Sequence, residues 1–422
     1  MKFYLLYTLA FLLFLNSCFS PSPPKETDIV SMQIVDRNGF TETISTKERL
    51  QGLGKNDFMS AQPYQKVLRV YGKSTLGKSR SLLTTYHPNG QLWQYLELVN
   101  GRAHGIFRQW YPDGTIQIDA FLVEGMGDVT EAAQLTWLFD GENSVYDSRG
   151  NLVNKFLYSK GNLEGTSISY HPNQQIAKEE FFEANLREGI HRTWDAQGVL
   201  REISSYKKGL CHGDCYRFWP SSTLCFKEHY VEGKLEEAVY YSKEGEILSS
   251  VKEGNGIKTG FEEDQVSYKM QIQKGEIQGL VERFSSRGNL TNSYYIDKGE
   301  KQGIENIFYP DPNKSLKISV EWKNGVIQGQ VRTWYPTGEI ESQKEIWGNQ
   351  RNGTCCAWYK NGDLMLMEEY ENDELVKGSY FKKGQKRAVS KVEKGEGIAT
   401  LHDPEGLFLK KISYSKGHPL ID

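Results

Sequence analysis

The sequence lacks the features that mark three large classes of protein. It has no apolar run of 18 residues after its N-terminus, so nothing in the body predicts a transmembrane helix. Its 51 Lys and Arg residues nearly balance its 54 Asp and Glu residues, which gives a formal net charge of −3. Lysine and glutamate are interspersed, and no basic stripe marks a face for nucleic acid or anionic lipid. We therefore expect no nucleic-acid partner.

Motifs for catalysis are also missing. The eight histidines are scattered, and their spacing suggests no Ser-His-Asp or Cys-His arrangement. No glycine-rich phosphate loop leads from a strand into a helix, because the glycines are spaced as turns. We expect a protein without enzyme activity and without a cofactor.

The cysteines offer one stretch that could bind zinc, through Cys211, Cys215, Cys225 and His229. Their spacing is unlike the close cysteine pairs of common zinc sites, so we expect no metal. We interpret Cys215 and Cys225 as substitutes for buried hydrophobic residues. If Cys18 is set apart, five of the six cysteines remain, so at least one lies outside any intramolecular disulfide. A bridge from Cys211 to a neighbour stays an open alternative.

Residues 1–17 predict a signal peptide. Lys2 supplies the positive start, the stretch Phe3–Leu15 is mostly apolar, and residues 3–24 carry no charge. The ending Leu-Asn-Ser-Cys resembles the bacterial lipobox, which implies cleavage before Cys18 and attachment of diacylglycerol to its thiol. Residues 18–28 would then be the lipidated cysteine and a Pro/Ser tether. A plain secretory signal with an incidental cysteine is the alternative.

Glycine is abundant, with 41 residues, and its spacing reveals an internal repeat. Each repeat has an aromatic residue, a glycine four positions later, and an aliphatic residue two positions after that glycine. An aromatic or aliphatic residue follows eight positions after the glycine, with further glycines at eleven and fifteen positions. One such repeat consists of Tyr86, Gly90, Leu92, Leu98, Gly101 and Gly105. The pattern returns about every 24 residues.

The repeat predicts a β-hairpin. A strand rich in aromatic and β-branched residues, such as residues 329–334, leads into a Pro-x-Gly or x-Asn-Gly turn. In the second strand the aliphatic and the later aromatic residue are six positions apart, so we expect both on one face. The Gly-x-x-x-Gly connector makes the return turn. We therefore expect an all-β protein, an elongated antiparallel β-meander of about twelve hairpin repeats with a small N-terminal cap.

The predicted array covers residues 82–422, and the cap region covers residues 29–81. Within the cap, residues 31–45 predict a hairpin around Asn38-Gly39, and residues 67–72 predict a strand. Residues 46–53 predict one or two helical turns with Thr46 as N-cap. Within the array, residues 127–144 form a short insertion with a short helix, and residues 254–270 and 379–398 are degenerate.

Three turns carry a diagnostic motif: Trp-Tyr-Pro-Asp-Gly at 110–114, Trp-Tyr-Pro-Thr-Gly at 334–338 and Trp-Tyr-Lys-Asn-Gly at 358–362. They resemble the MORN repeat, and more closely its bacterial variant, the MORN-2 repeat. The resemblance implies antiparallel meanders with an open groove for partner binding, and it supplies no catalytic residues. The bacterial family is often labelled as a YwqK-type antitoxin. Together with the lipobox, the array also resembles a family of chlamydial lipoproteins.

One feature of the repeats is a candidate interaction surface, the column of aromatic residues that precede the turns. The aromatic column comprises Tyr86, Trp110, Tyr146, Tyr170, Trp194, Trp219, Tyr241, Phe284, Trp334 and Trp358. It is either the hydrophobic spine that stacks the repeats or a groove for an extended ligand. Because a single-layer sheet cannot bury both faces, we expect part of the apolar face to be available to a partner.

These observations favour a non-enzymatic, membrane-anchored lipoprotein that serves as a β-repeat scaffold for protein interactions. We expect it at the bacterial cell envelope, at the outer membrane, the periplasmic face or the surface, with the membrane and a protein as its partners. One alternative is an antitoxin that binds a toxin directly, although a signal peptide does not suit a cytoplasmic antitoxin. Another is a module that binds glycans or lipids. An enzyme would need a convergent polar site that the sequence does not reveal.

Overall fold

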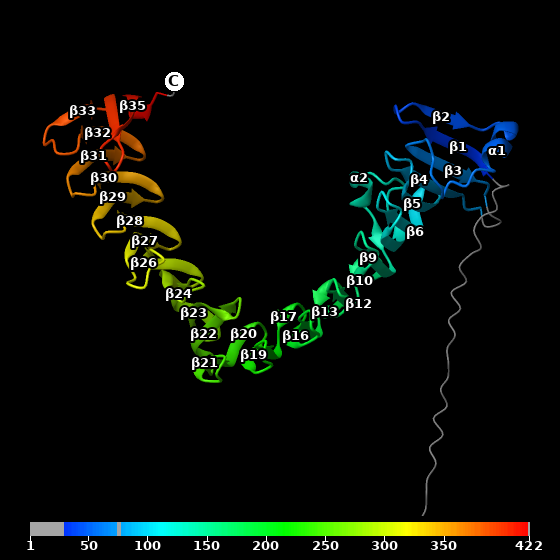
Figure 1. Ribbon diagram of the computed structural model, residues 1–422, viewed down its shortest axis with the longest axis horizontal. Coiled ribbons are helices and arrows are strands. Elements are labelled where there is room, and N and C mark those ends of the chain that lie inside the picture. The colour runs from blue at the N-terminus through cyan, green and yellow to red at the C-terminus, as the bar shows by residue number, and fades with distance from the viewer. Residues whose placement is uncertain (1–28, 74–76, 421–422) are drawn as a thin grey trace, which may run out of the picture. The chain divides into compact units, whose positions relative to one another are not determined.

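The computed structural model describes residues 29–73 and 77–420 of the chain (Figure 1). The predicted signal peptide, Cys18 and the tether lie outside the described residues. The prediction of an all-β antiparallel fold is confirmed: the described residues hold 36 strands and two short helices, and adjacent strands pair antiparallel. Neither helix is long and apolar enough to cross a bilayer. The chain divides into two compact units, residues 1–165 and 166–422, which we describe separately.

The first unit contains the cap and the first hairpins. Its helices are α1 (Lys47–Leu53) and α2 (Glu131–Gln134). Its strands are β1 (Ile29–Val35), β2 (Thr41–Ile44), β3 (Lys66–Tyr71), β4 (Arg80–Tyr86), β5 (Leu92–Val99), β6 (Arg102–Trp110), β7 (Ile116–Glu124), β8 (Leu138–Phe139), β9 (Gly141–Tyr146), β10 (Leu152–Ser159) and β11 (Asn162–Leu163).

The second unit continues with hairpins alone. Its strands are β12 (Gly165–Tyr170), β13 (Ile176–Glu183), β14 (Leu186–Arg187), β15 (Gly189–Trp194), β16 (Leu200–Lys207), β17 (Leu210–Cys211), β18 (Gly213–Phe218), β19 (Leu224–Val231), β20 (Lys234–Tyr241), β21 (Ile247–Lys252), β22 (Asn255–Glu262), β23 (Gln265–Gln273), β24 (Glu276–Phe284), β25 (Leu290–Asp297), β26 (Glu300–Phe308), β27 (Leu316–Lys323), β28 (Val326–Trp334), β29 (Ile340–Trp347), β30 (Gln350–Trp358), β31 (Leu364–Glu371), β32 (Glu374–Phe381), β33 (Ala388–Glu393), β34 (Glu396–His402), β35 (Phe408–Ser415) and β36 (His418–Pro419).

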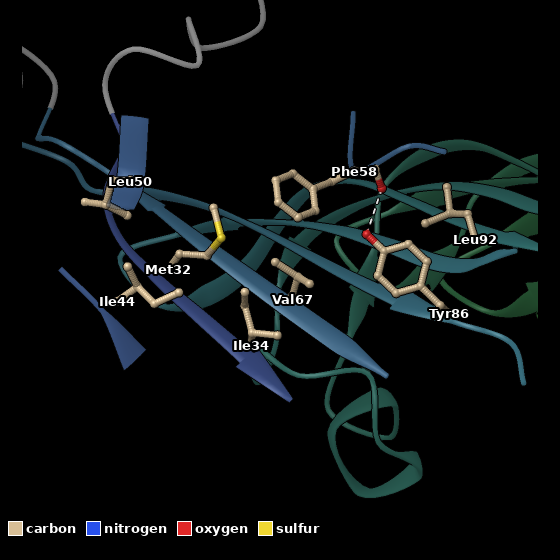
Figure 2. Close-up of a cluster of buried hydrophobic side chains, with 8 residues drawn as sticks. All are labelled: Met32, Ile34, Ile44, Leu50, Phe58, Val67, Tyr86 and Leu92. Carbon is tan, nitrogen blue, oxygen red and sulfur yellow. Dashed lines mark hydrogen bonds between the residues drawn. The ribbon is translucent and has the colours of Figure 1, made fainter. Parts of the chain in front are cut away.

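The cap folds as its sequence predicts. Strands β1 and β2 form the hairpin, and the backbone of Asn38 donates to the Asp36 carboxylate within its turn. Helix α1 follows Thr46 and ends at Gly54. Strand β3 pairs with β1 and with β4, which joins the cap to the first hairpin. Figure 2 shows the core that this arrangement buries, where the Tyr86 hydroxyl donates to the Phe58 carbonyl oxygen at 2.8 Å.

Two kinds of turn alternate along the chain, as predicted. Most turns after an aromatic residue close with a glycine at positive φ, for example Gly338 at 99°, and Gln174 and Ser222 take this conformation in two others. The return turn has two residues at positive φ, such as Lys298 at 49° and Gly299 at 83°. This pair has the sign pattern of a type I′ turn, whose twist matches that of the flanking strands.

The prediction that the aliphatic and the later aromatic residue share a face is wrong. Thr85 is opposite Gln94, yet its neighbour Tyr86 is opposite Leu92, so the register shifts by one residue between them. Opposed residues share a face and consecutive residues alternate, so Leu92 and Leu98 lie on opposite faces. A β-bulge beside each aromatic residue causes this change of phase. The hydrophobic clusters support this assignment, because Leu92 lies in the same cluster as Tyr86 whereas Leu98 lies in another.

The insertion and the degenerate segments have different outcomes. The insertion holds the predicted helix, α2, and the short strand β8. The segments 254–270 and 379–398, in contrast, form ordinary paired strands, including β22 and β33. In the first of them a two-residue turn at Glu263-Asp264 replaces the glycine turn, which is why the sequence pattern fades there.

Two parts of the second unit are related, which we call module 1 (residues 189–275) and module 2 (residues 329–417). In both, the turn after the last long strand comes back to an earlier one: Leu235 N donates to Gly275 O, and Leu375 N donates to Gly417 O, each at 3.1 Å. Buried residues match in order: Cys215 and Cys355, Leu235 and Leu375, Tyr240 and Tyr380, Val251 and Val392. The two modules therefore share one arrangement of buried residues and closing bonds, with residues 276–328 between them.

We predict that Gly353→Ala destabilises the fold by about 2 kcal/mol, through backbone strain and a steric clash. Gly353 has a φ of 113°, and an added Cβ would lie 3.1 Å from the Cβ of Glu345. The clash would also displace the Glu345 carboxylate, which accepts from Thr354 N at 3.1 Å.

Gly362→Ala is the matched control, because this glycine has a φ of 83° and open space around its Cβ position. It should cost about 1 kcal/mol from strain alone. Urea unfolding of both variants measures the difference, and equal losses would contradict the steric argument.

Candidate binding surfaces

The aromatic column lies beside the turns, where each member is opposite an aliphatic residue of the next strand. Tyr86 is opposite Leu92, and Trp334 is opposite Ile340. Tyr86 is buried and packs with Trp110, which belongs to the next repeat. The following members are half-buried: Trp110, Tyr146, Tyr170, Trp194, Tyr241, Phe284, Trp334 and Trp358.

Trp219 does not belong to the column, which corrects the prediction by one residue. Phe218 ends its strand opposite Leu224, so Phe218 holds the column position. Two adjacent aromatic residues made the choice ambiguous, and the missing turn glycine removed the landmark. The correction also moves Cys225 out of the aliphatic position, although it is fully buried as expected.

Trp219 instead belongs to a second set of side chains, the turn-opening residues, which bind one repeat to the next. Each donates to a backbone carbonyl at or beside the equivalent position of the following repeat. Tyr335, for example, donates its hydroxyl to Trp358 O at 2.7 Å. The other donor and acceptor pairs are Tyr111 to Tyr146, Tyr309 to Trp334, Tyr359 to Phe381, Trp219 to Ser242, His87 to Trp110 and His171 to Trp194.

A third set, the inner column, is the most deeply buried, and the sequence analysis missed it. It lies three positions before each column position: Leu83, Phe107, Asn143, Ser167, His191, Cys215, Ala238, Lys258, Val281, Glu305, Val331, Cys355, Gly378 and Ala399. All except Lys258 and Val331 are buried. Their mixed chemistry hides them from a search for hydrophobic periodicity. Their constant distance from the aromatic residue is the signal that would have found them.

Polar side chains of the inner column form hydrogen bonds with neighbouring side chains. Glu305 accepts from Lys301 Nζ at 2.7 Å and from Trp322 Nε1 at 2.9 Å. The ammonium group of Lys301 also lies 4.6 Å from the ring centre of Tyr294, at cation–π distance. Burial raises the pKa of Glu305, but the bonds from Lys301 and Asn292 outweigh it and hold the pKa below its usual value.

Both modules repeat a carboxylate held between two tyrosines. Glu228 accepts from the hydroxyls of Tyr230 and Tyr240, at 2.9 and 2.6 Å. Glu368 accepts from Tyr370 and Tyr380 in the same way, at 3.1 and 2.8 Å. Burial, together with the carboxylate charge, raises the pKa of all four tyrosines, so these hydroxyls remain donors.

His191 is the buried histidine of the inner column. Its side chain is 5% exposed and lies on the ring of Tyr206, with the ring centres 4.7 Å apart. Nε2 lies 3.1 Å from Phe181 O, and Nδ1 lies 3.5 Å from the Glu180 carboxylate. Burial lowers the pKa of His191, and the two acceptors offset only part of this effect.

The cysteines of the described residues are free, so the alternative of a bridge from Cys211 is not realised. Cys215, Cys225 and Cys355 are buried. Burial raises the pKa of the Cys225 thiol to about 12, which keeps it protonated. Within residues 29–73 and 77–420, no group of three or more His, Cys, Asp or Glu side chains is placed to hold a metal ion.

Two surface hollows accompany the repeats. In the first unit a cleft of about 1110 Å³ lies between Tyr86, His87 and the insertion around Val129. Lys66 Nζ binds Asp128 at 2.7 Å along its wall. In the second unit a groove of about 630 Å³ crosses β24, β25 and β26, where Leu280, Tyr295 and Ile304 line it.

Two segments of the chain, residues 103–122 and 187–208, match a family model described as a MORN repeat variant. The first covers the hairpin β6–β7 and the second covers β15–β16, each around its aromatic residue and turn. The predicted resemblance to the MORN-2 repeat is confirmed at these two places. A search among curated proteins finds no match. The chain thus carries MORN-type repeats in a β-repeat scaffold.

We predict that Trp334→Ala lowers the free energy of unfolding by about 2 kcal/mol, because a half-buried indole and its contact with Ile340 are lost. Trp347→Ala is the control, since that side chain is 58% exposed and should contribute less than about 0.5 kcal/mol. Chemical denaturation compares the two variants. A near-zero loss for Trp334→Ala would favour the groove interpretation of the column over the spine.

We predict that stability falls on acidification partly through His191. Its pKa is depressed in the folded state relative to its ordinary value of 6.5. As the pH falls, His191 therefore binds a proton in the unfolded chain before it does so in the folded protein. Its contribution to the free energy of unfolding declines as the pH falls from about 7 through 6.5 and below. His191→Val, which copies Val331 of module 2, should flatten this slope. Unfolding between pH 5 and 8 measures it, and an unchanged slope would refute the assignment.

Proposed function

We propose that this protein is a non-enzymatic lipoprotein, anchored to the bacterial cell envelope, whose β-repeat array is a scaffold that binds another protein. The lipid on Cys18 would tether the array, and residues 19–28 would separate it from the membrane. The array itself would supply the docking surface.

The observation that supports the scaffold most is that helices cover almost none of the sheet. Apart from α1 and α2, the described residues contain no helix that could cover a face. Large apolar side chains consequently remain exposed on strands, among them Phe181, Ile190, Tyr295 and Ile304. Such groups on a rigid surface are typical of protein-binding faces, because a partner gains by removing them from water.

The N-terminal segment supports the location. Its short charge-free apolar stretch followed by Ser17-Cys18 fits an exported lipoprotein. Export would separate the array from a cytoplasmic toxin, so we place the antitoxin hypothesis second. A glycan-binding role would use the aromatic column for stacking, but nothing in the arrangement of polar groups favours a sugar over a protein.

We predict that the native protein lies in the membrane fraction, lacks residues 1–17 and carries acyl mass. Cys18→Ala should lose the acyl group and leave the membrane, because the thiol is the attachment point. Cell fractionation and intact-mass measurement test both statements.

Cys211→Ala is the matched control and should stay in the membrane fraction, since Cys211 is half-exposed in the array and remote from the lipobox in sequence. Soluble protein that retains Met1 would overturn the proposed location. The antitoxin hypothesis would then become the better one, and a toxin would be the partner to seek.

A further inference from the structure

Module 1 closes with basic side chains beneath the hairpin β22–β23. Arg201 binds Asp264 in the turn of this hairpin at 3.1 Å and donates to Phe218 O at 3.2 Å. Arg217 donates to Phe261 O at 3.3 Å. These guanidinium groups fasten the hairpin across the inner face.

A third cation completes the arrangement. Lys258 on β22 binds Glu228 at 3.0 Å and so neutralises the carboxylate held between two tyrosines. The carbonyl and carboxylate groups inside module 1 are therefore bound by positively charged side chains of the same module.

Module 2 keeps the acceptors but loses these three cations. Glu341 stands at the position of Arg201, Ala357 at that of Arg217, and Ala399 at that of Lys258. Glu368 remains between its tyrosines, as Glu228 does in module 1. The substitutions remove three positive charges and add one negative charge beneath the hairpin β34–β35.

A cavity of about 500 Å³ lies at this place. Ala357, Glu341, Glu368 and His402 are among its lining residues. Glu341 has no hydrogen-bond or ion-pair partner within the described part of the chain. His402 Nδ1 is buried there and likewise has no hydrogen-bond partner among the described residues.

The positively charged side chains that module 2 does have either bind other groups or are exposed. Arg351 lines the cavity, but it binds Asp373 at 3.1 Å and lies on the ring of Tyr370 at 4.0 Å. Lys344 lines it as an exposed side chain. The hairpin turn is held from outside by Lys360, which binds Glu405.

We propose that the cavity of module 2 binds the guanidinium group of a ligand, in the place that Arg217 occupies in module 1. Glu341 would take the charge, and the carbonyl of His402 would accept as the carbonyl of Phe261 does in module 1. A planar guanidinium suits these acceptors better than an ammonium, since it donates in several directions within one plane. The ligand is a small guanidinium compound or an arginine side chain of a polypeptide. This inference goes beyond the proposed function and does not depend on Cys18.

Calorimetric titration of the purified full-length chain tests the proposal with four probes: arginine amide, citrulline amide, lysine amide and acetyl-Gly-Arg-Gly-amide. Arginine amide should bind, and citrulline amide, whose side chain is an uncharged isostere of that of arginine, should not. Lysine amide should bind more weakly than arginine amide. Equal affinity for arginine amide and the tripeptide would mean that the guanidinium alone is recognised, whereas tighter binding of the tripeptide would point to a polypeptide ligand.

Two variants connect binding to the cavity. Glu341→Gln should weaken arginine binding at least about tenfold, because the carboxylate is the unpaired charge. Ala357→Arg should abolish binding, because it restores the side chain of module 1 and fills the space. Circular dichroism and thermal unfolding establish that both variants are folded.

A measurement on the unaltered chain tests the proposal even if a variant fails to fold. Addition of arginine amide should shift the NMR signals of the His402 imidazole, while those of His191 stay in place. The proposal is overturned if arginine binds no better than citrulline, or if Glu341→Gln leaves its affinity unchanged. Neither result would affect the proposed anchor or location.

Discussion

The structure depends on one-residue β-bulges beside the pre-turn aromatic residues, as at Tyr86 and Trp334. At each bulge the strand changes phase, so the aromatic residue and its aliphatic partner lie on one face while the inner column lies on the other. Both faces therefore receive part of the apolar content of a repeat, and neither is a purely hydrophobic layer. This division explains why the aromatic column is only half-buried and why the inner face tolerates Asn143, His191 and Glu305.

The sequence predicts the features that the spacing of its residues determines. The turn glycines and the Asn38-Gly39 hairpin follow from backbone conformations that few residues adopt, so the sequence alone predicts them. Prediction from the sequence fails where the pairing of two strands shifts by one residue, because the composition does not change there. Counting alternate residues cannot register a bulge, and at Phe218-Trp219 it selected the wrong aromatic residue. The candidate cavity was beyond reach, because it arises from Ala357 and Glu341 standing where a related module has arginines.

The two modules show how one fold can carry different surfaces. Both have the carboxylate between two tyrosines and the same return turns. They differ, among other places, beneath the closing hairpin, where Arg217 of module 1 donates to Phe261 O and module 2 has a cavity lined by Ala357 and Glu341. A scaffold of this kind can diversify one site without disturbing the next, because each repeat contacts chiefly its neighbours.

The turn-opening residues have a mechanical consequence. Within each unit, successive hairpins are joined by a strand ladder and by one side-chain bond, such as that from Tyr335 to Trp358. Under a pulling force, single hairpins between the modules would peel away one at a time. Modules 1 and 2 would open as larger units, because their last turns are bonded back to Leu235 and Leu375.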